Sequence, residues 1–259
     1  MDNLFTNVYK AIKITEPLEK CLAIKNLYEN FTKFNLDKIK ITRITIPGRP
    51  KKPKLVDFKD VPNRKKGDIG LIHTIHAICH IEFNAINLAL DAVYRFQDLP
   101  EEYYYDWLQV AKEECYHFSL VQNYLKEIGY KYGDFDAHNG LWEMALKTDS
   151  DILERMALVP RLLEARGLDV NPLIKKKFIN SRYVKMPDLL DIILKDEIGH
   201  VKIGSYWFDY ICKKRNLNNE DTFIALIKKH IGEKLKPPVN IEARKQAGFK
   251  IRELNYING

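Results

Sequence analysis

The stretch Lys112-Glu113-Glu114-Cys115-Tyr116-His117 decides the fold, because its Glu-x-x-His pair returns as Glu197-Ile198-Gly199-His200. On a helix this spacing places the carboxylate and the imidazole one turn apart on one face. A further glutamate precedes each motif: Glu82 lies 32 residues before Glu114 (114 − 82), and Glu164 lies 33 residues before Glu197 (197 − 164). The sequence therefore contains a glutamate followed by Glu-x-x-His, twice.

Helical spacing places these glutamates on largely apolar faces. The positions three, four and seven residues from Glu82 are all apolar: Ile75, Ile78, Cys79, Ala85, Ile86 and Ala89. The surroundings of Glu164 are less uniform and include Arg161, which could pair with it. A carboxylate in an apolar core is costly unless it is paired or binds a metal. Four such carboxylates favour two divalent cations, with the imidazoles of His117 and His200 completing the ligand set.

One glutamate from each of two helices and a Glu-x-x-His from each of two others is the ligand set of the ferritin-like di-iron bundle. The alternative is that each Glu-x-x-His is a solvated or salt-bridged helical pair. We predict an all-α protein, a ferritin-like four-helix bundle with an N-terminal helical extension, a basic connector and a C-terminal helix and tail. Its core helices are expected at Leu71–Phe96, Glu101–Ile128, Ser150–Arg166 and Met186–Lys214.

The chain divides into three predicted segments: a helical extension with a connector (1–67), the bundle (68–217), and a C-terminal helix and tail (218–259) that pack on the bundle. Asn3–Phe34 is predicted to be helical with a break or kink at Pro17. Gly167 is expected to end the third core helix and Pro172 to prevent its quick resumption. Shorter helices are expected at Leu141–Lys147 and Glu220–Gly232, and the tail Lys236–Gly259 is expected to fold back over the bundle.

The segment Asp37–Lys66 has a different character, because prolines stop any long helix and basic residues dominate. Three acidic residues stand against eleven basic ones: Lys38, Lys40, Arg43, Arg49, Lys51, Lys52, Lys54, Lys59, Arg64, Lys65 and Lys66. One interpretation is a solvated linker packed along the bundle. The other is a strip that docks phosphate groups, with RNA as a partner.

Composition excludes several classes. The net charge of +7 allows an anionic partner without requiring one. No apolar run of transmembrane length and no secretory signal are evident, so no membrane partner is expected. Four scattered cysteines are typical of reduced thiols in a cytoplasmic protein. The chain lacks the Gly-x-Gly-x-x-Gly motif, the phosphate loop and the Gly-x-Ser-x-Gly elbow. Nucleotide-dependent and serine-hydrolase chemistry therefore have no support in the sequence.

Other polar residues compete for a functional role. His73, His76 and His80 form a separate stripe, interpreted as packing or hydrogen-bonding residues, with a zinc site as the alternative. Glu113 is expected to lie outside the ligand set and Glu154 to be exposed.

Several stretches resemble the bacterial ferritin-like family known as domain of unknown function 455. They are Pro47-Gly48-Arg49-Pro50, His80-Ile81-Glu82, Glu113–Phe118, Pro160–Asp169, Glu197–Val201 and Pro237–Phe249. The resemblance implies a dinuclear metal site at Glu82, Glu114, His117, Glu164, Glu197 and His200. Asn87 stands where an acidic residue is expected, so no ligand role is predicted for it. A more distant similarity is to the di-iron tRNA hydroxylase.

The functional hypothesis is an oxidoreductase with two Fe ions, of the O₂-dependent hydroxylase type, that needs an electron donor and an organic substrate. Manganese and a mixed iron–manganese pair remain open as metals. One alternative is a ferroxidase or peroxide-handling iron protein. The other is a binding protein in which metals serve only to stabilise the fold.

Overall fold

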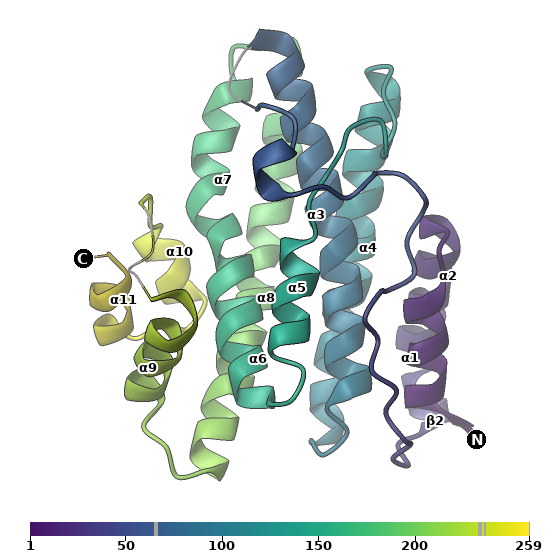
Figure 1. Ribbon diagram of the computed structural model, residues 1–259, viewed down its shortest axis with the longest axis vertical. Coiled ribbons are helices and arrows are strands. Elements are labelled where there is room, and N and C mark those ends of the chain that lie inside the picture. The colour runs from purple at the N-terminus through teal and green to yellow at the C-terminus, as the bar shows by residue number, and fades with distance from the viewer. Residues whose placement is uncertain (65–66, 233–234, 236, 259) are drawn as a thin grey trace. The chain divides into compact units, whose positions relative to one another are not determined.

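The computed structural model describes residues 1–64, 67–232, 235 and 237–258, and the chain divides into two compact units, Met1–Leu146 (unit 1) and Lys147–Gly259 (unit 2). The all-α prediction is confirmed, because the regular secondary structure of the described residues is helical apart from one isolated bridge and the short parallel pair of β1 (Asp2–Asn3) and β2 (Phe34–Asn35) (Figure 1). The unit boundary falls inside the predicted bundle segment 68–217. The division into 1–67, 68–217 and 218–259 stays a prediction.

Two long helices, α3 (Gly67–Arg95) and α4 (Glu101–Glu127), dominate unit 1 and lie side by side (Figure 1). They begin and end within a few residues of the predicted bounds. Residues 96–100 connect them, so the chain reverses and the helices are antiparallel neighbours, as expected. Pro100 precedes α4 and two glutamates occupy its first turn, where the helix dipole favours negative charge.

The N-terminal helices α1 (Leu4–Lys13) and α2 (Pro17–Glu29) pack on α3 and α4, respectively, and η1 (Phe31–Lys33) follows. The predicted break at Pro17 is confirmed, and the proline starts α2, where its missing N–H costs no hydrogen bond. Two leucines of α2, Leu18 and Leu22, are exposed. The buried face of α2 instead includes Lys20 between Pro17 and Ile24.

The predicted connector has no α-helix among its described residues, 37–64, and contains only the short η2 (Phe58–Asp60). Backbone groups fasten it to unit 1. Gly48 N donates to Ile12 O at 2.8 Å, Thr42 N donates to the Tyr94 hydroxyl at 2.7 Å, and the Trp142 indole of α5 (Gly140–Lys147) donates to Thr45 O at 2.9 Å. The described connector is therefore packed along unit 1. Lys65 and Lys66, counted among its eleven basic residues, lie outside the described residues.

Unit 2 contains α6 (Ile152–Leu158), the π-helix η3 (Val159–Glu164), α7 (Ala165–Phe178) and α8 (Met186–Lys214). The bounds of α8 match the prediction, but the expected helix end at Gly167 was wrong. The chain continues as α7 through Gly167 and Pro172 because tertiary contacts favour it. Leu168 and Phe178 are buried, and the Asn171 side chain donates to Leu190 O of α8 at 2.9 Å.

The C-terminal helices are α9 (Asn219–Ile231), α10 (Ile241–Gln246) and α11 (Ile251–Asn258), and α10 packs on α7 and α8. The Arg244 guanidinium holds α10 in place through Asp169 of α7, with nitrogen–oxygen distances of 2.9 and 2.8 Å. Within unit 2 the described tail therefore folds back onto earlier helices. Lys236 and Gly259, the first and last residues of the predicted tail, lie outside the described residues.

Helix α3 is long and apolar enough to cross a membrane by length and composition alone, which corrects the expectation that the chain has no such run. In the structure 72% of its most apolar window is buried by the protein itself. Most of the apolar surface of α3 therefore lies in the core of the protein. The cytoplasmic location stays a prediction.

The histidine stripe of α3 contacts both the connector and the loop that follows α4. His76 is 1% exposed, and its Nε2 accepts a hydrogen bond from Gly133 N at 2.9 Å. His80 Nδ1 lies 2.9 Å from the Tyr132 hydroxyl, and His73 Nδ1 lies 2.8 Å from Asn63 O. These contacts favour the packing interpretation. Among the described residues the three histidines do not belong to a group of ligand atoms that could hold a metal.

Acid should destabilise unit 1 through these histidines. Burial lowers the pKa of His76 and of His80 to about 4, so both fold as neutral rings. The unfolded chain takes up these protons below about pH 6.5, so stability is fully present above that pH and is lost as it falls toward 4. Each histidine should contribute on the order of 3 kcal/mol to the loss.

Urea unfolding of metal-free protein at pH 7 and pH 5 measures this effect. His76→Gln keeps an acceptor for Gly133 N but cannot titrate, so the stability difference between the two pH values should shrink. An unchanged difference would contradict the assignment.

Candidate metal site

Three of the six predicted ligands come together in unit 1. Glu82 lies on α3, and Glu114 and His117 lie one turn apart on α4. Each residue offers a ligand atom, and these atoms lie within 4.8 Å of one another. Their exposed fractions are 3%, 1% and 0%. We call this cluster the α3–α4 triad.

The geometry of the triad centres on the imidazole. His117 Nδ1 lies 3.3 Å from Glu82 Oε2 and 3.5 Å from Glu114 Oε2. Antiparallel packing of α3 and α4 brings Glu82 opposite the Glu-x-x-His pair. The surrounding core is apolar, with Cys79, Ile86 and Ala111 fully or almost fully buried. Two acidic groups and one imidazole thus share a site from which water is largely excluded.

Without a metal, protons must compensate these charges. Burial raises the pKa of the Glu82 carboxyl to about 7. Burial alone would lower the pKa of His117, but contact with Glu114 and Glu82 outweighs it and raises that pKa to about 11. The site therefore holds protons that a divalent cation would displace, as is usual for carboxylate and imidazole ligands.

The donor set fits a metal ion. Carboxylate oxygens and imidazole nitrogens suit iron, manganese and zinc, and this ligand set does not select among them. A cation would replace the shared protons as the compensating charge in the apolar core. The α3–α4 triad can therefore hold a metal ion.

The second predicted triad lies in unit 2 and is less compact. His200 Nδ1 lies 3.8 Å from Glu197 Oε1 on α8, and the two residues are 1% and 8% exposed. Glu164 is half-buried at the last residue of η3, with its Oε2 buried. Within the described part of unit 2, these three residues do not gather their ligand atoms as closely as the α3–α4 triad does.

The position of Glu164 depends on the π-helix, a feature often found at functional sites. A π-turn contains an extra residue, so the ideal helical wheel drawn around Glu164 does not hold there. Close packing fixes η3 against α8: a Cβ added at Gly204 would lie 2.5 Å from Pro160 side-chain carbons. Gly204 is therefore the residue that allows this approach.

Arg161, considered above as a partner for Glu164, pairs elsewhere. Its Nη2 donates to Glu253 Oε2 at 2.8 Å, and its Nε donates to the Ser205 hydroxyl at 3.1 Å. The guanidinium carbon lies 4.2 to 4.7 Å from the ring centres of Phe208, Phe223 and Phe249. Arg161 thus connects η3 to the C-terminal tail.

The rival carboxylates have other contacts. Glu113 accepts a hydrogen bond from Gln109 Nε2 at 3.0 Å, consistent with a place outside the ligand set. Glu154 is half-buried rather than exposed, because Lys229 and His230 of α9 lie 2.6 and 3.3 Å from its oxygens. Helical spacing around Glu154 cannot reveal these partners, since they come from a helix far away in the sequence.

Asn87 belongs to a buried polar contact that the sequence analysis did not find. Its Oδ1 accepts a hydrogen bond from Lys20 Nζ at 2.5 Å, and both residues are 0% exposed. Lys20 Nζ also donates to Ile12 O and Gly48 O, at 2.9 and 3.0 Å. The sequence does indicate that Lys20 is unusual. It lies at helical spacing between Pro17 and the apolar Ile24 and Leu27, at a position where an apolar residue is expected.

Metal affinity should rise with pH. When a metal binds, it displaces the proton of His117 at any pH below about 11, and it displaces a second proton from Glu82 below that group's pKa of about 7. The logarithm of the association constant should therefore climb by about two per pH unit near pH 6 and by about one near pH 8.

A competition assay with a chelator of known affinity, corrected for its own protonation, gives this slope. Glu113→Gln is the control and should keep it. Affinity that does not change with pH would mean that the ion binds elsewhere.

Removing the partner of Arg161 should be costly. Glu253→Ala leaves a buried guanidinium without its carboxylate, and we expect a loss of about 3–5 kcal/mol in the free energy of unfolding. Replacing the pair with Arg161→Met and Glu253→Leu should recover most of that loss. The exposed Glu242→Ala should change stability by less than about 0.5 kcal/mol. Urea unfolding tests the series, and equal effects for Glu253→Ala and Glu242→Ala would refute the role of the pair.

Comparisons with known proteins agree with the sequence resemblance. The model of the family described as "Protein of unknown function (DUF455)" matches residues 13–255. A protein of Haemophilus influenzae described as uncharacterized is 47% identical over 264 residues, which cover 96% of this chain and 92% of that protein. No solved structure matches. The similarity to the di-iron tRNA hydroxylase stays a prediction. The chain belongs to the DUF455 family.

Proposed function

We propose that this protein is a metal-dependent oxidoreductase with a dinuclear, iron-containing centre, and that it catalyses O₂-dependent hydroxylation of an organic substrate. The observation that carries the proposal is the α3–α4 triad, in which two carboxylates and an imidazole meet at 3.3 and 3.5 Å in the core. The matching Glu164, Glu197 and His200 of unit 2 supply the second half of the ligand set. The reason for assigning both sets of residues to one dinuclear centre is the sequence pattern, a glutamate followed by Glu-x-x-His, which occurs twice.

Charge favours a metal over an alternative structural role for these groups. Two buried carboxylates beside one imidazole carry more negative charge than the imidazolium can compensate, and the core around them is apolar. A stabilising ion pair would place one acid against one base. The same ratio of two carboxylates to one imidazole recurs in the sequence with Glu164, Glu197 and His200. Four carboxylates therefore match the charge of two divalent cations.

The protein residues in this proposal bind, orient and exclude water. Glu114 and His117 would hold an ion from one face of α4, and Glu82 would hold it from α3. The buried surroundings keep bulk water away, which strengthens electrostatic interactions in the site. Bound iron would supply redox chemistry toward dioxygen, and the protein would place the substrate beside it.

Metal content tests the ligand assignment residue by residue. Purified protein loaded with Fe(II) should hold about two ions per chain. Glu114→Ala and Glu197→Ala should each lose at least one ion, and the double variant should lose both. Glu113→Ala and Asp196→Ala change the adjacent carboxylates and serve as matched controls that keep full metal content. Full metal content in the Glu114→Ala, Glu197→Ala double variant would overturn the assignment.

Oxygen uptake separates the proposed reaction from its alternatives. A hydroxylase centre should consume O₂ in the Fe(II) form, with iron staying bound at about two ions per chain. Repeated oxidation of added Fe(II) beyond that number would favour ferroxidase chemistry. Metal that resists O₂ and raises the melting temperature would favour a stabilising role. Glu114→Ala should abolish the uptake while Glu113→Ala keeps it.

A further inference from the structure

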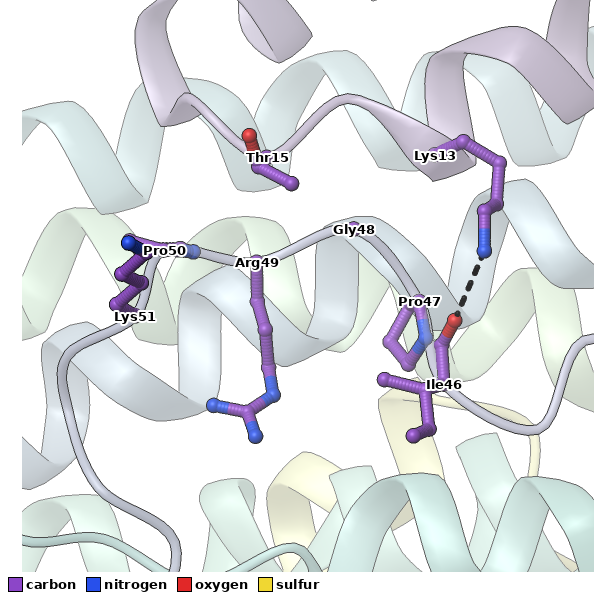
Figure 2. Close-up of a pocket in the computed structure, with 8 residues that line it drawn as sticks. All are labelled: Lys13, Thr15, Ile46, Pro47, Gly48, Arg49, Pro50 and Lys51. Atoms are coloured by element: carbon purple, nitrogen blue, oxygen red, sulfur yellow. Dashed lines mark hydrogen bonds between the residues drawn. The ribbon is translucent and has the colours of Figure 1, made fainter.

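A pocket on unit 1 lies where the connector passes the turn between α1 and α2 (Figure 2). Its volume is about 410 Å³, within the range typical of small-molecule sites. Its lining comes from two short segments: Lys13, Thr15, Ile46, Pro47, Gly48, Arg49, Pro50 and Lys51. Figure 2 shows Lys13 reaching toward Ile46 at one end, Arg49 projecting from the middle of the connector, and Lys51 at the other end. The pocket is separate from the α3–α4 triad.

All charged residues of the lining are basic. The lining includes three basic side chains, Lys13, Arg49 and Lys51, and no acidic residue. Lys13 Nζ donates to Ile46 O at 3.5 Å, and Arg49 Nη1 donates to Pro53 O at 3.4 Å. Both distances are long, and both acceptors are neutral carbonyls. Within the described part of the chain, none of the three cations forms an ion pair with a carboxylate. The pocket therefore offers positive charge that its own residues do not neutralise.

The backbone floor of the pocket is held firmly in place. A Cβ added at Gly48 would lie 2.2 Å from Ile14 O, so only glycine allows the connector to approach α1 this closely. Gly48 N donates to Ile12 O, and Gly48 O accepts from the buried Lys20 Nζ. Burial lowers the pKa of Lys20 to about 7, and the positive charge of Lys13 contributes in the same direction. An anion above Gly48 would relieve this repulsion.

We propose that this pocket binds the phosphate group of a phosphorylated ligand. A guanidinium and two ammonium groups are donors that phosphate oxygens use in proteins. The fixed Gly48 peptide sets the spacing between the connector and Thr15 in advance. The volume exceeds that of a bare ion, so a larger molecule that carries the phosphate fits. This inference stands apart from the proposed oxidoreductase chemistry.

Full-length protein titrated with inorganic phosphate tests the pocket. The readout is the backbone amide shifts of Ile46, Gly48, Arg49 and Lys51, and chloride at equal ionic strength is the reference. Phosphate should shift these amides saturably. Arg49→Gln with Lys51→Gln should weaken the affinity at least tenfold. Lys54→Gln with Lys59→Gln removes the same charge from the same connector outside the pocket and should weaken it less than twofold. Arg49→Lys with Lys51→Arg keeps the charge and should retain binding, and all variants should keep their metal content.

Two results would overturn the proposal. One is the absence of a saturable shift in the wild-type protein. The other is equal weakening by the two glutamine pairs, which would mean that only net charge matters.

A second titration distinguishes the sources of the phosphate. Binding of transfer RNA at two salt concentrations, measured by fluorescence anisotropy, reports on a polynucleotide backbone. A loss that is selective for the Arg49→Gln, Lys51→Gln pair would assign the pocket to RNA phosphate. The other outcome is that transfer RNA does not bind, or that both glutamine pairs weaken its binding equally. If inorganic phosphate binding is still lost selectively in the Arg49→Gln, Lys51→Gln pair, the pocket would be assigned to a small phosphorylated molecule.

Discussion

The contact of His117 with Glu82 and Glu114 is the constraint on which unit 1 depends. These groups are almost fully buried in an apolar core, where charge is expensive unless it is compensated. Protons compensate it in the metal-free protein, as the raised pKa values of Glu82 and His117 show. Such an arrangement costs stability in the core, and its carboxylates and imidazole are groups that could hold a metal ion. The antiparallel packing of α3 on α4 is what holds the three groups at that distance.

Lys20 is a second buried basic residue, and it holds the connector against α3. Lys20 joins α1, the connector and α3 by donating to Ile12 O, Gly48 O and Asn87 Oδ1. An acidic residue at 87 would pair with the lysine, whereas the amide of Asn87 accepts its hydrogen bond without adding charge. The lysine thus fixes the connector against α3 while its proton remains weakly held. The same contact defines the floor of the basic pocket.

Local rules predicted most of the helices and half of the site. Helical periodicity and the Glu-x-x-His spacing were enough for α3, α4 and α8 and for the meeting of Glu82, Glu114 and His117, because all of these follow from the regular 3.6-residue repeat. The sequence pattern failed around Glu164, where η3 departs from that repeat and α7 continues through Gly167 and Pro172. It also missed Lys20 and the pairing of Arg161 with Glu253, since both depend on partners that lie far away in the sequence.

The π-helix η3 places an unusual restriction on how the sequence of unit 2 can vary. Its extra residue sets the rotation of every side chain between Leu158 and Ala165 relative to the helices on either side. Deleting one residue there would allow an ordinary α-helix to form and would turn Glu164 by about 100° around the axis. A conservative substitution would leave that rotation intact. In this stretch, the number of residues is therefore under tighter constraint than the identity of most of them.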